Sequence, residues 1–224
     1  MAFFNQLTRR SLSQSAVMSA VIKNVTVIGS GLMGAGIAQV AAQSGHKVTM
    51  VDLDKEIVKK AEQKISASVQ KAAKKKFGDN NDDAVKFTSE VLERLSTSTD
   101  AVAAVKGADL VIEAIVENLD AKKTLFVQLD PPSSNPSWKK SKDYKAGGSS
   151  RRSYSEETKQ DIEKSNTVAP QHTIFASNTS ALSITEISEA TQRKDRFGGL
   201  HFFNPVPIMK LLEVITFRRV YEET

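Results

Sequence analysis

The sequence predicts an α/β fold in which helices cover a doubly wound parallel sheet. Apolar, β-rich runs alternate with helix-like segments, and this alternation is typical of parallel strands joined by crossover helices. The run at 109–116 is almost continuously apolar, as expected for a strand buried on both faces of a sheet. A glycine-rich turn follows the first strand, and the strand order is expected to switch after the fifth element.

The strands are the β-rich apolar runs, and the helices are the segments between them. The predicted strands are 23–28, 47–51, 95–99, 109–116, 173–177, 199–203 and 210–215. The predicted helices are 32–43, 55–77, 84–92, 101–105, 119–129 and 184–190.

The longest predicted helix has clear signals at both ends. Asp54 is a suitable N-cap, and the run Gly78–Asn81 contains residues that break helices. Between them, apolar residues recur at steps of three and four, as on one face of a helix. These residues are Ile57, Val58, Ala61, Ile65, Val69 and Ala72. With the helix at 84–92 running back, the segment predicts a helical hairpin arm.

The first two strands and the helix between them predict a dinucleotide-binding unit. Gly29 allows a tight strand-to-helix turn, Gly31 lets the backbone approach a pyrophosphate, and Gly34 lets the helix pack against the strand. The pyrophosphate is expected at the helix N-terminus. Asp52 is placed to accept hydrogen bonds from ribose hydroxyls, which favours NAD over NADP. The predicted cofactor contacts are Gly29, Gly31, Leu32, Met33, Gly34 and Asp52.

The composition excludes several classes of function. The chain contains no cysteine, which excludes disulfides and thiolate metal sites, and no apolar run is long enough for a membrane span. The formal net charge of +5 comes from two segments, with +2 from 1–22 and +3 from 131–170. The rest of the chain is neutral in sum, which argues against nucleic-acid binding.

Residues 1–20 are predicted to be a mitochondrial transit peptide. They contain two arginines, several serines and no acid, and the first acid of the whole chain is Asp52. Phe4, Leu7 and Leu12 have the spacing of an amphipathic helix. The alternative is a disordered N-terminal tail with no targeting role.

The segment 131–170 is predicted to be a disordered insertion between a helix and the next strand. It contains nine serines, four of the six prolines and no Leu, Phe or Met. Such a composition buries too little apolar surface to offset the entropy of ordering the segment. The alternative is a functional arm.

His201 and Glu213 are a candidate catalytic pair. Oxidation of an alcohol by hydride transfer needs a base for the hydroxyl proton, and histidine is suited to this near neutral pH. A carboxylate that holds the imidazole improves the base. His201 falls at a strand end and Glu213 within the following strand, so the two side chains could meet across neighbouring strands. From spacing alone, a structural histidine beside a turn remains the alternative.

Four sequence blocks carry a resemblance to a known family: 27–38, 113–118, 177–180 and 200–207. They resemble the L-3-hydroxyacyl-CoA dehydrogenase family, in particular the mitochondrial short-chain enzymes of fatty-acid β-oxidation. The resemblance covers 23–130 and 172–215. It implies a Rossmann-like NAD-binding domain over 21–216, NAD-dependent oxidation of L-3-hydroxyacyl-CoA to 3-ketoacyl-CoA, and a location in the mitochondrial matrix.

The resemblance also implies roles for single residues. His201 is the expected base for the 3-hydroxyl, and Glu213 orients it. Ser180 and Asn204 are expected to contact the substrate carbonyl region and the nicotinamide, and they count among both the catalytic and the cofactor-binding residues.

Four further positions match residues of the family that contact ligands. Glu117 and Lys122 are expected to line the cofactor cleft. Ser68 and Lys75 are expected to hold coenzyme A, and the basic end of their helix suits its phosphates.

The chain also departs from the family's pattern. The connection at 131–170 replaces a short one, and 217–224 forms an atypical tail. The helical C-terminal domain, which in the family closes the acyl pocket and forms the homodimer, is expected to be absent, with at most residual activity as a consequence. The alternatives are a non-catalytic NAD-binding module, an unstable truncated isoform, and a crystallin-like relative with a structural role.

Overall fold

The computed structural model describes residues 22–130 and 168–216 of the chain. The strands are β1 Asn24–Ile28, β2 Lys47–Val51, β3 Leu95–Ser98, β4 Leu110–Glu113, β5 Ile174–Ser177, β6 Phe197–Phe202 and β7 Leu212–Ile215. The helices are α1 Leu32–Gln43, α2 Lys55–Phe77, α3 Asn81–Glu93, α4 Ala101–Val105, α5 Leu119–Leu129 and α7 Ile184–Ser188, with a 3-10 turn η2 at Lys194–Arg196. The predicted transit peptide and the atypical tail lie outside the described residues.

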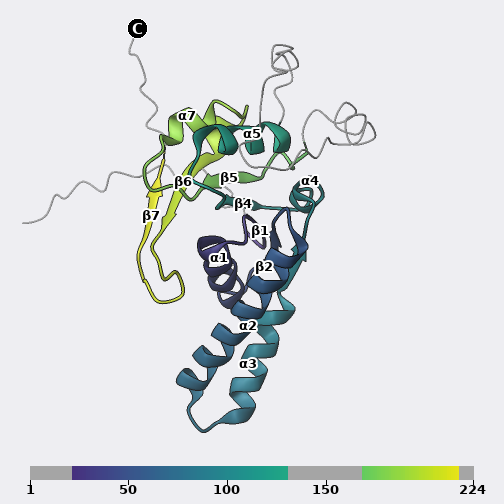
Figure 1. The fold of residues 1–224 in the computed structure, drawn as a ribbon, viewed down its shortest axis with the longest axis vertical. Helices are drawn as coiled ribbons and strands as arrows, with labels where there is room; N and C mark the ends of the chain where they lie inside the picture. Colours follow the sequence, from purple (N-terminus) through teal and green to yellow (C-terminus); the bar gives the residue numbers. More distant parts are fainter. Residues whose placement is uncertain (1–21, 131–167, 217–224) are drawn as a thin grey trace, which may run out of the picture.

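The strands form one seven-stranded sheet, in the order β3-β2-β1-β4-β5-β6-β7 (Figure 1). Neighbours from β3 to β6 are parallel, and β7 pairs antiparallel with β6. From β1 to β3 each new strand is added on one side of β1, and from β4 onwards each is added on the other side. The sheet is therefore doubly wound, as predicted. Ligands of such sheets bind where the order reverses, outside the carboxyl ends of the strands.

The strands are buried on both faces because neighbouring side chains point to opposite sides of the sheet. In β1, Val27 packs on the side of α1 and α2, whereas Ile28 packs on the other side. That other side is closed by α4, α5 and α7, where Phe126 lies with its ring centroid 5.5 Å from that of Phe175 and 4.8 Å from that of Phe197. The apolar runs of the sequence thus form two cores, one on each face.

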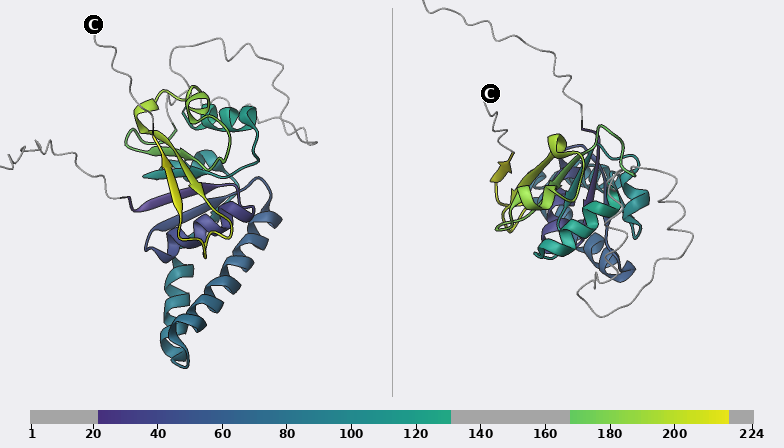
Figure 2. Two further views of the ribbon diagram at one scale, coloured as in Figure 1. Left: turned by 90° about the vertical axis from the view of Figure 1, so that its left-hand side faces the viewer. Right: turned by 90° about the horizontal axis from the view of Figure 1, so that it is seen from above.

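The helical arm predicted from the sequence is present. Helices α2 and α3 lie side by side and extend well beyond the sheet (Figures 1 and 2). The Asp54 side chain accepts a hydrogen bond from the Glu56 N–H, and α2 ends at Gly78, whose φ is +58°. Helix α3 begins at Asn81, three residues before the predicted start, because the Asn80 side chain caps it by accepting the Asp83 N–H. That capping residue stands within the predicted helix break.

The fourth strand is shorter than predicted. It ends at Glu113 rather than at Val116. The Glu113 side chain accepts the Ile115 N–H, and the chain turns out of the sheet towards the glycine turn. Apolar residues after the strand therefore lie outside the sheet, and Val116 is exposed. Smaller differences occur elsewhere, since α7 ends two residues early, β6 begins two residues early and β7 begins two residues late.

The last residues of the predicted insertion belong to the folded domain. Ala169 is buried and its N–H lies 3.4 Å from the Leu129 carbonyl oxygen. The Arg193 guanidinium donates to the Pro170 carbonyl oxygen at 2.7 Å. The prediction of disorder was therefore wrong for 168–170, whose backbone is held by a buried arginine, and the rest of that segment lies outside the described residues. Among the helices that the structure describes, none has the length and apolarity needed to cross a membrane.

Candidate active site

The glycine turn has the geometry that its sequence predicts. Gly29 has φ +100°, and a Cβ at this position would lie 2.5 Å from the Ala114 carbonyl oxygen. A Cβ on Gly34 would lie 1.7 Å from the Gly29 carbonyl oxygen, so only glycine allows α1 to approach the turn. A Cβ on Gly31 would meet no atom within 4 Å. The backbone at the N-terminus of α1 thus borders open space, as an approaching pyrophosphate requires.

Asp52 lies just beyond the carboxyl end of β2, beside this turn. Its Oδ2 accepts hydrogen bonds from the Ser30 N–H at 2.8 Å and from the Ser30 hydroxyl at 2.9 Å. Its Oδ1 accepts the Leu53 N–H at 2.8 Å. The carboxylate is therefore fixed in orientation at the edge of the sheet, and it is only half-buried. Of the other predicted contacts, Leu32 is exposed and Met33 is half-buried.

His201 and Glu213 meet as predicted. They are direct partners in the antiparallel register of β6 and β7. His201 Nδ1 lies 2.8 Å from Glu213 Oε2, and His201 Nε2 lies 2.9 Å from Ser180 Oγ. The histidine side chain is 17% exposed. A carboxylate on one ring nitrogen fixes the tautomer, which leaves the other nitrogen, the one beside Ser180, unprotonated and able to act as a base.

Asn204 lies in the exposed turn after β6 and makes a cis peptide bond to Pro205. Val206, in the same turn, is buried against the side of α1 at Gly36. This contact brings the turn after β6 next to the glycine-turn helix. The two motifs, far apart in the sequence, therefore lie at one edge of the sheet.

Lys122, a predicted cofactor contact, pairs with two carboxylates. Its side chain is fully buried, with Nζ 2.6 Å from Glu113 Oε1 and 3.3 Å from Glu117 Oε2. A lysine that leaves water needs carboxylate partners, and the pair at this position supplies them. Glu117 lies closer to the surface, with 42% of its side chain exposed.

The two glutamates have shifted pKa values of opposite sign. Burial raises the pKa of Glu113, and the nearby Lys122 charge opposes this only in part. Burial also acts to raise the pKa of Glu117, but the Thr179 hydroxyl, the Lys122 charge and the Ser180 N–H together lower it. Glu117 is thus an anion held by several donors.

Sequence reasoning missed Glu113 and Thr179 as parts of this network. Glu113 Oε2 accepts a hydrogen bond from the Ser177 hydroxyl, and Glu117 Oε1 accepts one from the Thr179 hydroxyl. The available signal was an acid in the middle of the apolar run that was predicted as the fourth strand. Burying a charged group there demands partners on neighbouring strands.

Ser68 and Lys75 lie on the arm, away from the sheet. They are seven residues apart on α2, so they share one helix face. Lys75 is exposed and Ser68 is half-buried. They are therefore on a different element from His201 and Glu213, which lie on β6 and β7.

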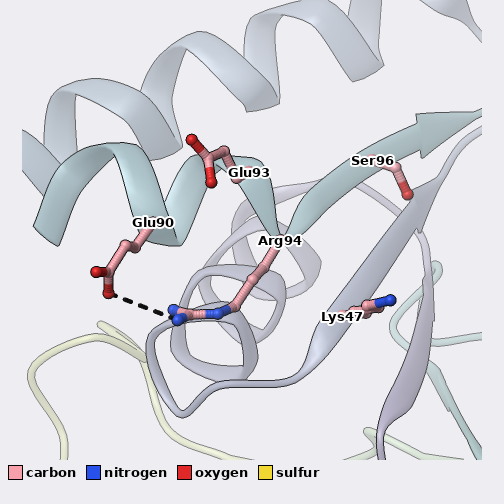
Figure 3. Close-up of a pocket in the computed structure, with 5 residues that line it drawn as sticks. All are labelled: Lys47, Glu90, Glu93, Arg94 and Ser96. Atoms are coloured by element: carbon pink, nitrogen blue, oxygen red, sulfur yellow. Dashed lines mark ion pairs between the residues drawn. The ribbon is translucent and has the colours of Figure 1, made fainter. Parts of the chain in front are cut away.

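A surface hollow lies at the opposite edge of the sheet (Figure 3). Its lining residues are Lys47, Glu90, Glu93, Arg94 and Ser96. Lys47 begins β2 and Ser96 lies early in β3, so the hollow is at the amino ends of the parallel strands. Glu90 of α3 forms an ion pair at 3.6 Å with Arg94, the C-cap residue that follows this helix. None of the predicted site residues lines it, and no cluster within 22–130 and 168–216 could hold a metal ion.

The family is decided by comparison with known proteins. The family model described as "3-hydroxyacyl-CoA dehydrogenase, NAD binding domain" matches residues 24–136 and 155–224. The chain belongs to the 3-hydroxyacyl-CoA dehydrogenase family. The match spans the glycine turn, the Glu113–Lys122 network and the His201–Glu213 pair, so the site described above lies within the family's NAD-binding domain.

Similar proteins of this family occur in animals and bacteria. The human mitochondrial hydroxyacyl-coenzyme A dehydrogenase is 46% identical over 96% of this chain, and a probable 3-hydroxybutyryl-CoA dehydrogenase of Bacillus subtilis is 37% identical over 91%. The structure of 3-hydroxybutyryl-CoA dehydrogenase from Escherichia coli is similar with a TM-score of 0.62 and 36% identity, covering 86% of this chain and 32% of that one. The chain spans 59% of the length of the human relative and 56% of the Bacillus subtilis relative.

Proposed function

We propose that this chain binds NAD and takes part in oxidising L-3-hydroxyacyl-CoA to 3-ketoacyl-CoA, in fatty-acid β-oxidation. One observation carries the proposal. The His201 imidazole lies between the Glu213 carboxylate and the Ser180 hydroxyl, at the same edge of the sheet as the glycine turn.

The described residues fit NAD. Open space borders the N-terminus of α1 at Gly31, where backbone N–H groups and the helix dipole favour a pyrophosphate. Asp52 lies one strand away with a fixed carboxylate that can accept from ribose hydroxyls and would repel a 2′-phosphate. When bound, NAD supplies the hydride acceptor at its nicotinamide ring. The remaining proposed cofactor contacts are Leu32, Met33, Glu117, Lys122, Ser180 and Asn204.

The chain's own residues handle the proton. Glu213 holds the hydrogen of His201 Nδ1, so that Nε2 carries the free lone pair. Nε2 then accepts the proton of the substrate 3-hydroxyl group as hydride leaves carbon 3, the carbon that bears this hydroxyl. Ser180, at 2.9 Å from Nε2, is placed to orient the substrate oxygen against the base, and Glu213 stabilises the imidazolium that forms.

The arm is proposed to hold the coenzyme A part of the substrate. Ser68 and Lys75 lie on one face of α2, and Lys75 is exposed near the basic end of the helix. Its ammonium group suits a phosphate.

The acid-free N-terminal segment supports a transit peptide in residues 1–20 and a location in the mitochondrial matrix, and the relatives from human and pig bear mitochondrial names. The NAD-binding domain is proposed to span 21–216.

The test combines calorimetric titration of the chain with NADH and a turnover assay with 3-hydroxybutyryl-CoA and NAD. We expect saturable NADH binding. If the wild-type chain turns over the substrate, we expect His201→Ala to abolish turnover while leaving NADH affinity unchanged. The matched control is His46→Gln, because His46 lies in the turn after α1, outside the proposed site, with its ring Nδ1 3.1 Å from the Ile22 carbonyl oxygen. NADH binding without turnover would favour a non-catalytic NAD-binding module, and turnover by His201→Ala would remove this residue as the base.

A further inference from the structure

Ser30 is a buried polar residue at the glycine turn to which the proposed reaction gives no role. It lies between Gly29 and Gly31, and only 3% of its surface is exposed. Its hydroxyl group donates to Asp52 Oδ2 at 2.9 Å, and its N–H donates to the same oxygen at 2.8 Å. This single residue therefore holds one oxygen of the Asp52 carboxylate with two donors.

The sheet fixes the main chain around Asp52 but not its side chain. Ile28 and Val51 are register partners in the parallel pair of β1 and β2, and the Gly29 N–H donates to the Val51 carbonyl oxygen at 2.8 Å. The Asp52 N–H donates to the Ser98 carbonyl oxygen at 3.3 Å. With the main chain held on both sides, the freedom that remains is rotation of the Asp52 side chain about its own bonds.

The donors of Ser30 restrict this rotation next to water. Asp52 is half-buried, and the chain is exposed from 53 to 57 directly after it. A carboxylate has about four positions at which it can accept hydrogen bonds. Ser30 occupies two of them on Oδ2, and the Leu53 N–H occupies one on Oδ1 at 2.8 Å. Oδ1 therefore keeps the capacity to accept from a further donor such as a ribose hydroxyl.

We propose that Ser30 is a positioning residue, whose hydroxyl group fixes the Asp52 carboxylate and thereby sets the preference for NADH over NADPH. The inference rests on the proposed function, because it concerns the same dinucleotide site. A fixed carboxylate accepts from ribose hydroxyls without first being ordered, and it cannot turn away from a 2′-phosphate that it repels. A carboxylate free to rotate loses both effects, so NADH binds less tightly and NADPH is rejected less.

Two variants remove the hydroxyl group and one matched variant controls for the change. Ser30→Ala keeps the Cβ atom, and Ser30→Gly removes it as well, so the two together separate the hydroxyl group from packing. The control is Ser44→Ala, the same change at the exposed C-cap of α1. Asp52→Ala, made alone and together with Ser30→Ala, completes a double-mutant cycle that isolates the coupling of the two side chains.

Three measurements are made on the full chain: the dissociation constants of NADH and of NADPH by calorimetric titration, and hydrogen exchange of the Leu53 amide by NMR without dinucleotide. In both Ser30 variants we expect the NADH dissociation constant to rise about fivefold, because a hydrogen bond to the charged Asp52 is lost. The NADPH dissociation constant should stay the same or fall. The Leu53 amide should exchange at least about threefold faster, because its acceptor is less firmly held.

The double-mutant cycle and the control have their own expected results. In the Asp52→Ala background, Ser30→Ala should change neither dissociation constant by more than about twofold, because the carboxylate on which it acts is absent. Ser44→Ala should leave all three values as in the wild type.

A purely structural role of Ser30 predicts a different pattern. The inference is overturned if both dissociation constants rise in the same proportion, or if Ser30→Ala alters their ratio equally in the Asp52→Ala background. It is also overturned if neither Ser30 variant folds, or if Leu53 exchange is unchanged in both. A wild-type chain that binds neither dinucleotide would contradict the proposed function, whereas Leu53 exchange would still decide whether the Ser30 hydroxyl group holds Asp52.

Discussion

Gly34 shows how a single residue determines the approach of a helix to a strand. A Cβ there would lie 1.7 Å from the Gly29 carbonyl oxygen, which is backbone and cannot move away without opening the turn. We expect Gly34→Ala to lower the free energy of unfolding by about 3 kcal/mol, as overpacking does, measured by urea unfolding. The control is Gly107→Ala, where a Cβ would meet no atom within 4 Å and the change should stay within about 0.5 kcal/mol. Equal losses for the two variants would contradict this interpretation.

Asp130 provides a pH-dependent contribution to stability. It pairs with Arg193 at 2.7 Å, and both side chains are buried. Burial acts to raise the pKa of Asp130, but the hydrogen bonds from Arg193 and Thr191 and the arginine charge lower it below the ordinary value of 3.8. A carboxylate with a lowered folded-state pKa stabilises the protein above the unfolded-state value, and this contribution is lost as pH falls through the folded-state value.

The prediction from this pair concerns a difference between two proteins. At pH 6 we expect Asp130→Asn to be less stable than the wild type by about 3 kcal/mol, because Arg193 is left buried without its anion. Below pH 3.8 the difference should shrink as the wild-type carboxyl group becomes protonated. Urea unfolding of both proteins between pH 3 and pH 6 measures it. A difference that does not vary with pH would show that Asp130 acts through shape and not through charge.

At the scale of elements, the caps determine where the arm begins. The Asp54 carboxylate accepts the Glu56 N–H at 2.7 Å, which satisfies a free donor at the start of α2. We expect Asp54→Ala to cost about 1 kcal/mol of unfolding free energy, and Asp54→Asn to cost much less, since both Asp and Asn are good N-caps. Asp79→Ala is the control, because Asp79 lies between α2 and α3 and caps neither helix. A loss equal to that of Asp54→Ala would point to charge and not to capping.

At the scale of the whole molecule, Arg193 joins the two flanks of the segment 131–167. Its guanidinium contacts Asp130 on one flank and the carbonyl oxygens of Ala169 and Pro170 on the other. The flanks also meet directly, since the Ala169 N–H lies 3.4 Å from the Leu129 carbonyl oxygen. The two flanks of 131–167 are therefore held together by contacts among Leu129, Asp130, Ala169, Pro170 and Arg193.

This closure gives a prediction for a shortened chain. We expect replacement of 131–167 by two glycines to preserve the fold and NADH affinity. We also expect it to raise the free energy of unfolding by about 2 kcal/mol, because a shorter loop costs less closure entropy. Urea unfolding and NADH titration measure both effects. Loss of folding, or of NADH binding, would show that the replaced residues contribute contacts to the domain.

Much of the fold and of the site follows from the sequence because the signals are local. The glycine spacing, the Asp54 cap and the apolar strand runs predict the elements within a few residues of their observed bounds. The sequence also indicated that His201 and Glu213 could meet across neighbouring strands, and the register of β6 and β7 pairs them. Where the prediction failed, hydrogen bonds between side chains and backbone were responsible. Glu113 ends β4 early by capping its own turn, and Arg193 orders 168–170 from a distant position in the chain.

The sequence by itself determined the order of elements, the glycine turn and the chemical types at the site, because helix periodicity, turn geometry and side-chain chemistry are properties of neighbouring residues. Only the tertiary structure decided which side chains form hydrogen bonds and ion pairs with one another. The register of β6 and β7 sets His201 against Glu213, and the packing of α5 on the sheet buries Lys122 between two glutamates. Such contacts depend on how strands and helices pack in space, and spacing along the chain does not encode that packing.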